Sequence, residues 1–449
     1  MRAKTSRCLR NLLVVVLILS ALYVAYRYTL RRRVEAKLDE IRKQGYPATL
    51  AELDEWYPQP PPGENAADLY LKAFSLCVTN SADETLPFVG TAHIPSRSTP
   101  LPEEMKRGIA QYLERNQAAL NLFHEASNVK LSRYPTEGSD LKTLFVSLLD
   151  HLRLIRVGMR MLSLECLLNS SNGDSDRAAG AIKALLALAE STKARPKLIT
   201  YLSEQPIQGM AVEDLEQALS RTSFKDDQLK NLMGAFHEVE TANAFSFAII
   251  GERAQANTAW QEMLNESGSA RKFMVDWDKL SNFDQIVATL YRPLGLIDLD
   301  YLARLEFFDE FLRASKVPFP EGLKQMASLK DKHALFNVLP VAKQEVKTET
   351  DMPNIEGRNQ SRLRAVYTSL GIERYRLSNG TLPDSLNTLV PRFLSEVPAD
   401  PFDGRPLRYK KLTRGYVVYS VGQDGKDDGG VEPRGGYPPG TDITFTVEH

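Results

Sequence analysis

The feature that most constrains this chain is an uncharged run near its N-terminus, Leu12–Tyr26. As a helix with a rise of about 1.5 Å per residue, these 15 residues cover only about 22 Å of the ~30 Å hydrocarbon core of a bilayer. Asn11 and the stretch from Arg27 to Leu30 lengthen the segment to about 20 residues, because an arginine can extend its charge to the interface and tyrosines favour that layer. The sequence therefore predicts a transmembrane helix at residues 11–30.

Two other interpretations also fit an apolar N-terminal run. A cleaved signal peptide has a similar basic start and short apolar core, but it needs a cleavage site built from closely spaced small residues. Here Ala21 and Ala25 are separated by bulky side chains, and Arg27 follows. A buried helix of a soluble domain is disfavoured by the flanking arginines. We therefore expect an uncleaved anchor, preceded by a basic flank at residues 1–10.

The formal net charge of −1 is the sum of two regions of opposite sign. The first 33 residues contain eight Lys and Arg and no Asp or Glu, which leaves 48 basic against 57 acidic residues, a net of −9, in the rest of the chain. A body this acidic argues against nucleic-acid binding. The contents of 43% hydrophobic and 25% charged residues are ordinary for globular proteins, and they exclude a disordered chain, a collagen-like repeat and a polytopic membrane protein.

The body of the chain has the patterning of a helical protein. Residues 31–63 are predicted to form a juxtamembrane helix and a Pro-rich linker, and residues 64–345 an α-helical domain. The strongest predicted helix is Leu141–Leu168, whose apolar residues recur at helical spacing. Helices joined by short polar turns, without a fixed repeat period, predict an irregular bundle or short solenoid.

Residues 346–449 have a different sequence pattern. A polar stretch at 346–357 leads into a helix at 358–377, after which prolines and short alternating runs replace the helical pattern. In Asp442–Val447, three apolar residues alternate with Thr444 and Thr446, which predicts a half-buried strand. The segment is predicted to be an α+β module with a small antiparallel sheet. The fold class expected for the whole chain is mainly α.

Several short blocks of this module resemble a known family. LSNGTLPDSLNTLV, VPADPFDGRPLRYK, GYVVYSVGQDGKDDGG and TDITF follow the order of blocks in the C-terminal half of the major pseudopilins of type II secretion. The resemblance covers about 90 residues, 358–449. It implies a helix packed on an antiparallel sheet.

The N-terminal part departs from that family. A pseudopilin has a short leader ending in Gly and a Glu at the fifth position of its apolar helix, and neither is present here. The chain as a whole is more similar to uncharacterised single-pass bacterial membrane proteins that end in a pseudopilin-like module. The four basic residues on each side of the span give no orientation. The resemblance implies a cytoplasmic (inner) membrane location with the body in the periplasm.

The resemblance also implies a metal site. Pseudopilins bind calcium in the loop before the last strand through Asp side chains and backbone carbonyls, and the matching positions are Asp424, Asp428 and Asp442, with Asp427 nearby. Several oxygen ligands on a flexible Gly-rich loop suit a hard cation such as calcium. The spacing does not fit an EF-hand. The alternative is a solvated cluster of Asp-Gly turns.

The histidines and cysteines form no recognisable catalytic or zinc motif. The six histidines include no His-Glu-x-x-His and no pair at i, i+4, and the chain has no Gly-x-Ser-x-Gly elbow, Walker loop or dinucleotide fingerprint. Cys8, beside the span, is a candidate for acylation. Cys77 and Cys166 either form one disulfide in an exported body or are two buried thiols. We therefore predict no catalytic residues and, apart from calcium, no cofactor.

Together these patterns favour a non-enzymatic scaffold or interaction protein of the bacterial cell envelope, held by one spanning helix and bound to protein partners. One alternative is an accessory component of a type II secretion or pilus-like machine, which would use the C-terminal module. Another is an envelope hydrolase with a site between helices, which would need converging His, Asp or Glu side chains.

Overall fold

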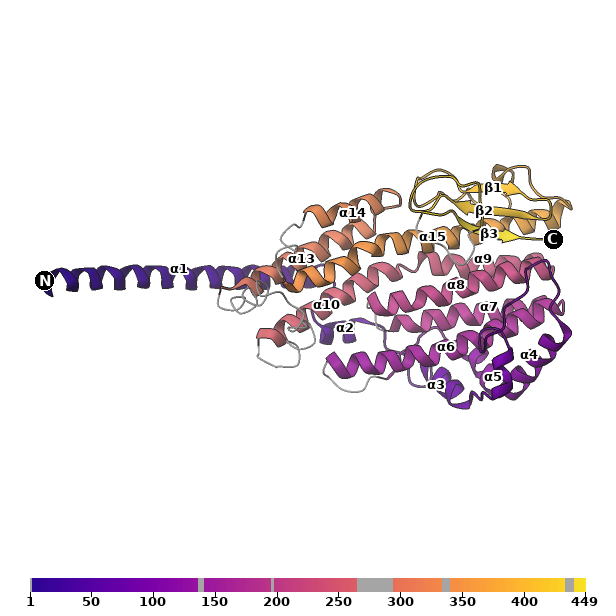
Figure 1. Ribbon diagram of the computed structural model, residues 1–449, viewed down its shortest axis with the longest axis horizontal. Helices are drawn as coiled ribbons and strands as arrows, with labels where there is room; N and C mark the ends of the chain where they lie inside the picture. The colour runs from indigo at the N-terminus through magenta and orange to yellow at the C-terminus, as the bar shows by residue number, and fades with distance from the viewer. Residues whose placement is uncertain (1, 136–140, 195–197, 265–293, 333–339, 433–439) are drawn as a thin grey trace. The chain divides into compact units, whose positions relative to one another are not determined.

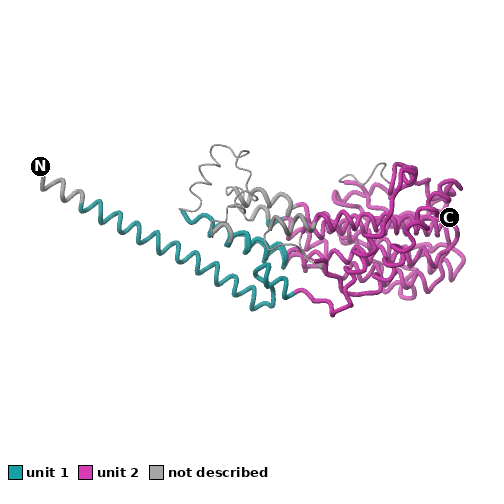
Figure 2. Tube along the Cα trace, turned by 90° about the horizontal axis from the view of Figure 1, so that it is seen from below, with its two compact units in different colours: residues 1–56, 250–313, 328–350 teal, residues 57–249, 314–327, 351–449 magenta. Residues whose placement is uncertain are grey.

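The structure is a computed structural model that describes residues 2–135, 141–194, 198–264, 294–332, 340–432 and 440–449 (Figure 1). The described residues are mainly helical, with a long apolar helix at the N-terminus and a small antiparallel sheet near the C-terminus, which confirms the predicted fold class. The chain forms two compact units (Figure 2). Unit 1 comprises Met1–Trp56, Ile250–Arg313 and Ser328–Thr350, and unit 2 comprises Tyr57–Ile249, Ala314–Ala327 and Asp351–His449.

Unit 1 is organised around α1 (Arg2–Lys43), a helix of 42 residues. Nothing interrupts it, because no Gly or Pro occurs before Gly45, where a φ of +80° and the nearby Pro47 end the helix. Leucine, valine and isoleucine side chains are exposed along its first half. In the second half, one face is buried in the core of unit 1, through Leu30, Val34, Leu38 and Ile41.

Among the described residues, five further helices contribute to unit 1. They are α2 (Leu50–Trp56), α10 (Ala244–Leu264) from residue 250 onward, α13 (Leu296–Ser315) up to residue 313, α14 (Glu321–Lys332) from residue 328 onward, and α15 (Pro340–Asn379) up to residue 350. Asn257 of α10 donates from Nδ2 to the carbonyl oxygen of Ala48 at 2.7 Å, and the hydroxyl of Thr258 accepts from the amide of Leu50 at 3.3 Å. These bonds join segments about 200 residues apart in sequence.

Unit 2 is a helical bundle with α7 (Ser175–Glu190) near its centre. Its alanines, among them Ala178, Ala181 and Ala184, are fully buried, and the helix packs against α5, α6, α8 and α9. Asp174 caps α7 by accepting from the amide of Arg177 at 3.1 Å, as its position before the helix predicts. The strongest predicted helix is confirmed as α6. The other helices that the structure describes with residues in unit 2 are α3 (Ala66–Leu76), α4 (Glu103–Arg115), α5 (Gln117–Ala126), α6 (Leu141–Ser171), α8 (Leu198–Arg221), α9 (Asp226–Thr241), α14 (Glu321–Lys332) and α15 (Pro340–Asn379), together with the start of α10 up to Ile249 and the end of α13 from Ala314. Short 3₁₀ turns occur at Ser81–Thr85, Ser191–Ala194 and Leu386–Leu389.

The C-terminal sheet has the order β1 (Arg408–Lys411), β2 (Tyr416–Ser420), β3 (Ile443–Val447), with both pairs antiparallel. Gly415 precedes β2 at a φ of +91°, and a Cβ there would lie 1.8 Å from the carbonyl oxygen of Val447, so only glycine fits. The helix before the sheet, α15, begins at Pro340 and therefore includes the polar stretch 346–357.

The prediction that β3 is half-buried is wrong. All five of its residues are buried, including Thr444 and Thr446. On β2, Tyr419 and Val417 are the partners of these two threonines, and a Cβ on Gly430 would lie 2.7 Å from Tyr419 and 3.2 Å from Val417. The loop around Gly430 therefore covers the face that alternation assigns to solvent.

Candidate functional site

The first candidate site is the apolar half of α1, Leu12–Tyr28. One helix among the described residues is long and apolar enough to cross a membrane, and it is this one. The exposed fractions of Leu17 and Leu22 are 60% and 62%, values that water would penalise and lipid would not.

Two buried acidic residues of α13 join α1 to the rest of unit 1. Asp298, which is fully buried, accepts from Arg27 at 2.9 Å and lies 3.9 Å from Arg31. Asp309 accepts from Lys37 at 2.6 Å and from Arg253 at 2.6 Å. Helix α1 and α13 are therefore packed together within unit 1.

The pair of Arg253 and Asp309 lies in the interior of unit 1. The side chain of Arg253 is 1% exposed, and its guanidinium lies 5.6 Å from the ring centroid of Tyr46. Burial lowers the pKa of Arg253 despite its bond to Asp309. Burial alone would lower the pKa of Lys37 too, but its hydrogen bonds to Asp309 and Glu40 raise it. The Asp309 carboxylate is therefore an ion-pair partner of both cations, Arg253 and Lys37.

The second candidate site is the C-terminal loop for which calcium is predicted. Asp442 is fully buried, and its Oδ2 accepts from the amide of Gly430 at 2.8 Å. Burial raises the pKa of Asp442 against the effect of that bond. Asp424 accepts from the amide of Lys426 at 3.0 Å, and Asp427 accepts from the amide of Gly429 at 2.9 Å, so both form short turns.

The loop for which calcium is predicted is described only in part. Among the described residues, no group of three His, Cys, Asp or Glu side chains lies close enough to hold a metal ion, so Asp424, Asp428 and Asp442 are not brought together as a side-chain ligand set. Oδ1 of Asp442 is buried and has no hydrogen-bond partner in the part of the chain that the structure describes. An acceptor of that kind suits a cation. Residues 433–439 of the same loop lie outside the described residues. The calcium site stays a prediction.

Millimolar calcium is expected to raise the Tm of the detergent-solubilised full-length protein, because a ligand that binds only the folded state stabilises it by about 2.7 kcal/mol at a hundred times its Kd. Asp442→Asn keeps the size of the side chain and removes its charge, so it should abolish the shift. Magnesium, which demands stricter octahedral geometry, should shift the Tm less. Equal shifts in the variant and the natural protein would contradict the site.

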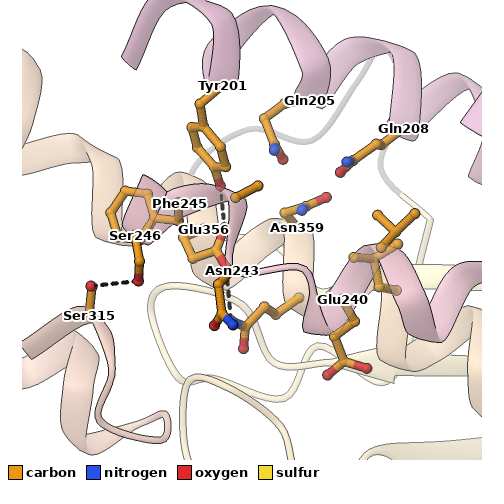
Figure 3. Close-up of a pocket in the computed structure, with 14 residues that line it drawn as sticks. Tyr201, Gln205, Gln208, Glu240, Asn243, Phe245, Ser246, Ser315, Glu356 and Asn359 are labelled. Carbon is orange, nitrogen blue, oxygen red and sulfur yellow. Dashed lines mark hydrogen bonds between the residues drawn. The ribbon is translucent and has the colours of Figure 1, made fainter. Parts of the chain in front are cut away.

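The third candidate site is a polar pocket in unit 2, the amide pocket, with a volume of ≈ 50 Å³. Three chain segments form most of it: α8, α15, and the turn between α9 and α10. The turn depends on Asn243, which has a φ of +52°, a conformation that asparagine tolerates better than most residues. Its polar lining residues include Tyr201, Gln205, Gln208, Glu356, Asn359 and Gln360 (Figure 3).

Most of the polar groups in this pocket are hydrogen-bonded to one another. The carboxylate of Glu356 accepts from the hydroxyl of Tyr201 and from Nε2 of Gln360, the latter at 2.9 Å. Burial raises the pKa of Glu356 against the effect of these bonds, and both burial and the nearby carboxylate raise the pKa of Tyr201. Arg364 donates to Glu240 at 2.8 Å and to Oε1 of Gln360 at 3.2 Å.

Two buried side-chain atoms in the pocket lack a hydrogen bond. Nε2 of Gln205 and Oε1 of Gln208 have no partner within the described residues. Gln208 is 2% exposed, and its other end donates to Glu204. Burial raises the pKa of Glu204 to about 8, against the effect of Lys193 at 3.4 Å. Among the buried atoms of the pocket in the described residues, one donor and one acceptor are therefore free.

The remaining predicted groups have ordinary structural roles. Cys77 is half-buried and Cys166 is buried, and both are free thiols, which is the second of the two alternatives that the sequence left open. His124 contacts Glu165 at 2.8 Å, and His449 contacts Glu373 at 3.1 Å.

Comparison with known proteins gives no relative: no family model matches this chain, and no curated protein or solved structure matches it significantly.

Proposed function

We propose that this chain is a membrane-anchored, non-enzymatic scaffold or interaction protein of the bacterial cell envelope, located in the inner membrane with its body in the periplasm. The observation that carries the proposal is the exposed apolar half of α1. A long helix with leucines about 60% exposed needs a lipid or protein environment, and its length and composition suit a bilayer.

The way α1 enters unit 1 supports a scaffold. A flexible tether would let the body move freely, whereas α1 continues without interruption into the core of unit 1 through Val34 and Ile41. The salt bridges from Asp298 and Asp309 fix it further. Unit 1, packed in this way on its proposed anchor, is suited to holding partners at a set distance from the membrane.

The bonding of two buried carboxylates, those of Glu356 and Glu216, supports a non-enzymatic role. Glu356, in the amide pocket, has both oxygens engaged by Tyr201 and Gln360. Glu216 accepts from the amide of Thr446 and lies 3.5 Å from Arg97. Carboxylates held in this way stabilise packing, whereas a general acid or base must reach a substrate.

The accessory role in a type II secretion or pilus-like machine is the second candidate. It is supported by the order of the sequence blocks in the C-terminal module and by the antiparallel order β1-β2-β3 next to α15. This role would make pseudopilins the partners of the module.

The test is a capture experiment combined with a topology measurement. Full-length protein with a tag after His449 is cross-linked in cells, extracted with detergent and purified. The control carries an unrelated single-span anchor in place of residues 1–26, which keeps Arg27 as the partner of Asp298. We expect the same near-stoichiometric protein partners with both anchors, and activity of a periplasmic reporter fused after His449. Pseudopilins among those partners would favour the second candidate.

Partners lost with the natural anchor would assign binding to the span. The absence of any stoichiometric partner, or a reporter active only in the cytoplasm, would contradict the proposal.

A further inference from the structure

We propose that the amide pocket of unit 2 is a binding site for a small uncharged ligand, which it recognises through a carboxamide group. This inference is independent of the proposed scaffold function, so either can fail without the other.

The free donor and acceptor define the recognition chemistry. Gln205 and Gln208 are three residues apart on α8 and so lie on one face of the helix. Figure 3 shows the ends of their side chains facing the same space, together with that of Asn359. A carboxamide carries an acceptor and a donor side by side: its oxygen would accept from Nε2 of Gln205, and its N–H would donate to Oε1 of Gln208.

Because the free donor and the free acceptor are both buried, their lack of a hydrogen bond points to a missing binding partner. A buried polar atom without a hydrogen bond costs about 1–3 kcal/mol, and in folded proteins such atoms are rare. Two of them, one donor and one acceptor, lie in the same pocket. A ligand that satisfies both recovers this cost, which is the usual basis of specificity for amide and hydroxyl groups.

The charges around the pocket select a neutral ligand. Glu356 is already bonded to Tyr201 and Gln360, so it does not offer a free carboxylate to a cation. Glu240 is paired with Arg364, and this pair is neutral as a whole. An anion would meet two acidic side chains, and a cation would find both of them engaged.

The size of the pocket selects a small group. Pockets for drug-sized molecules are about 300–1,000 Å³, whereas this one is ≈ 50 Å³. That volume suits one functional group of a few heavy atoms. The exposed Asn243 and the partly exposed Glu240 lie at its border, which gives a route from solvent. The ligand is therefore a small amide or the carboxamide end of a larger molecule.

The experiment is saturation-transfer NMR on the full-length protein in detergent, with three small probes of similar size. Acetamide presents both a donor and an acceptor, acetone only an acceptor, and acetate an anion. We expect saturable transfer to acetamide and at least fivefold less to acetone and acetate. A factor of five corresponds to about 1 kcal/mol, the contribution of one hydrogen bond.

The matched variant is Gln205→Met, which keeps the length of the side chain and removes the free donor. Gln208 is left intact because its other end binds Glu204. We expect the acetamide signal to fall about fivefold in Q205M and to stay unchanged in Gln117→Met, the same substitution at an exposed site of unit 2. If Q205M does not fold, Gln205→Glu replaces it, with the same expected loss.

Equal transfer to the three probes, no transfer to acetamide, or an unchanged signal in the Gln205 variant would overturn the proposal. Each of these results would assign the pocket to ordered water, which can satisfy the same two atoms.

Discussion

Placing two arginines in the middle of the apolar half of α1, as Leu17→Arg with Ile18→Arg, will release the protein from membranes. Each arginine at the centre of a spanning helix costs about 2.5–3.5 kcal/mol on insertion scales, whereas each leucine or isoleucine contributes about 0.3–0.6 kcal/mol. The pair therefore outweighs most of the favourable transfer of the run. We expect the natural protein in the carbonate-resistant membrane pellet and the double variant in the soluble or degraded fraction.

Ala36→Arg is the matched control for this variant. Ala36 is exposed on the same helix but beyond the apolar half, so an added charge there should leave the protein in the membrane pellet. Retention of the double variant in the carbonate-resistant fraction would show that α1 is not the anchor, and the proposed function would then lose its main support.

Replacing Asp309 by Asn is expected to destabilise unit 1 by about 3–5 kcal/mol, the usual cost of removing one partner from a buried ion pair. The variant leaves Arg253, with 1% of its side chain exposed, without its carboxylate at 2.6 Å, and it also removes the partner of Lys37. The measurement is denaturant unfolding followed by tryptophan fluorescence. Trp56 and Trp260 belong to unit 1, and Trp260 stacks on Tyr301 with ring centroids 4.4 Å apart.

The control for Asp309 is the same substitution at an exposed ion pair of α1. Asp39 lies 3.1 Å from Arg42, and both side chains are largely exposed, so Asp39→Asn should cost less than about 1 kcal/mol. A second comparison replaces the buried pair as a whole, as Arg253→Met with Asp309→Leu. Apolar residues of similar volume should recover much of the stability lost in Asp309→Asn. A small effect of Asp309→Asn would mean that water reaches Arg253.

Local patterns were sufficient to predict the main elements of the fold. An uncharged run predicts the apolar half of α1, helical spacing predicts α6, and alternation places β3 at residues 443–447. These signals work because each element buries its own periodic face. The second face of β3 could not be predicted, since the loop that covers it around Gly430 has no periodicity of its own.

The three chain segments that form unit 1 could not be predicted, because the contacts that join them are between residues far apart in sequence. Its three segments come from both halves of the chain, and bonds such as that between Asn257 and Ala48 join them. The partly buried ion pair of Arg27 and Asp298 also joins distant segments, since its two residues are 271 positions apart in sequence. In the sequence, these charges look like ordinary solvated residues.

The amide pocket illustrates the same limit for function. Tyr201, Gln205 and Gln208 follow helical spacing on α8, which could have indicated a shared face. A polar face on a helix is normally turned to water, and only the packing of α15 against it, through Glu356, shows that it is buried. Tyr201 and Glu356 are 155 positions apart, so no local pattern indicates that they are in contact.

The proposed membrane anchoring would give the C-terminal sheet a further consequence, because molecules confined to a surface meet often and exposed strand edges are prone to pair between chains. At one edge of the sheet, the amides of Thr446 and Glu448 on the β3 side donate to Glu216 and to the hydroxyl of Ser220, both on α8. At the other edge, β1 is only four residues long and ends in the exposed Lys410 and Lys411. Helix α8 thus pairs with one edge of the sheet. At the other edge, the short length and the lysines of β1 oppose pairing with another strand. Under the proposed anchoring, neighbouring copies would therefore meet without their sheets pairing into a continuous β-structure.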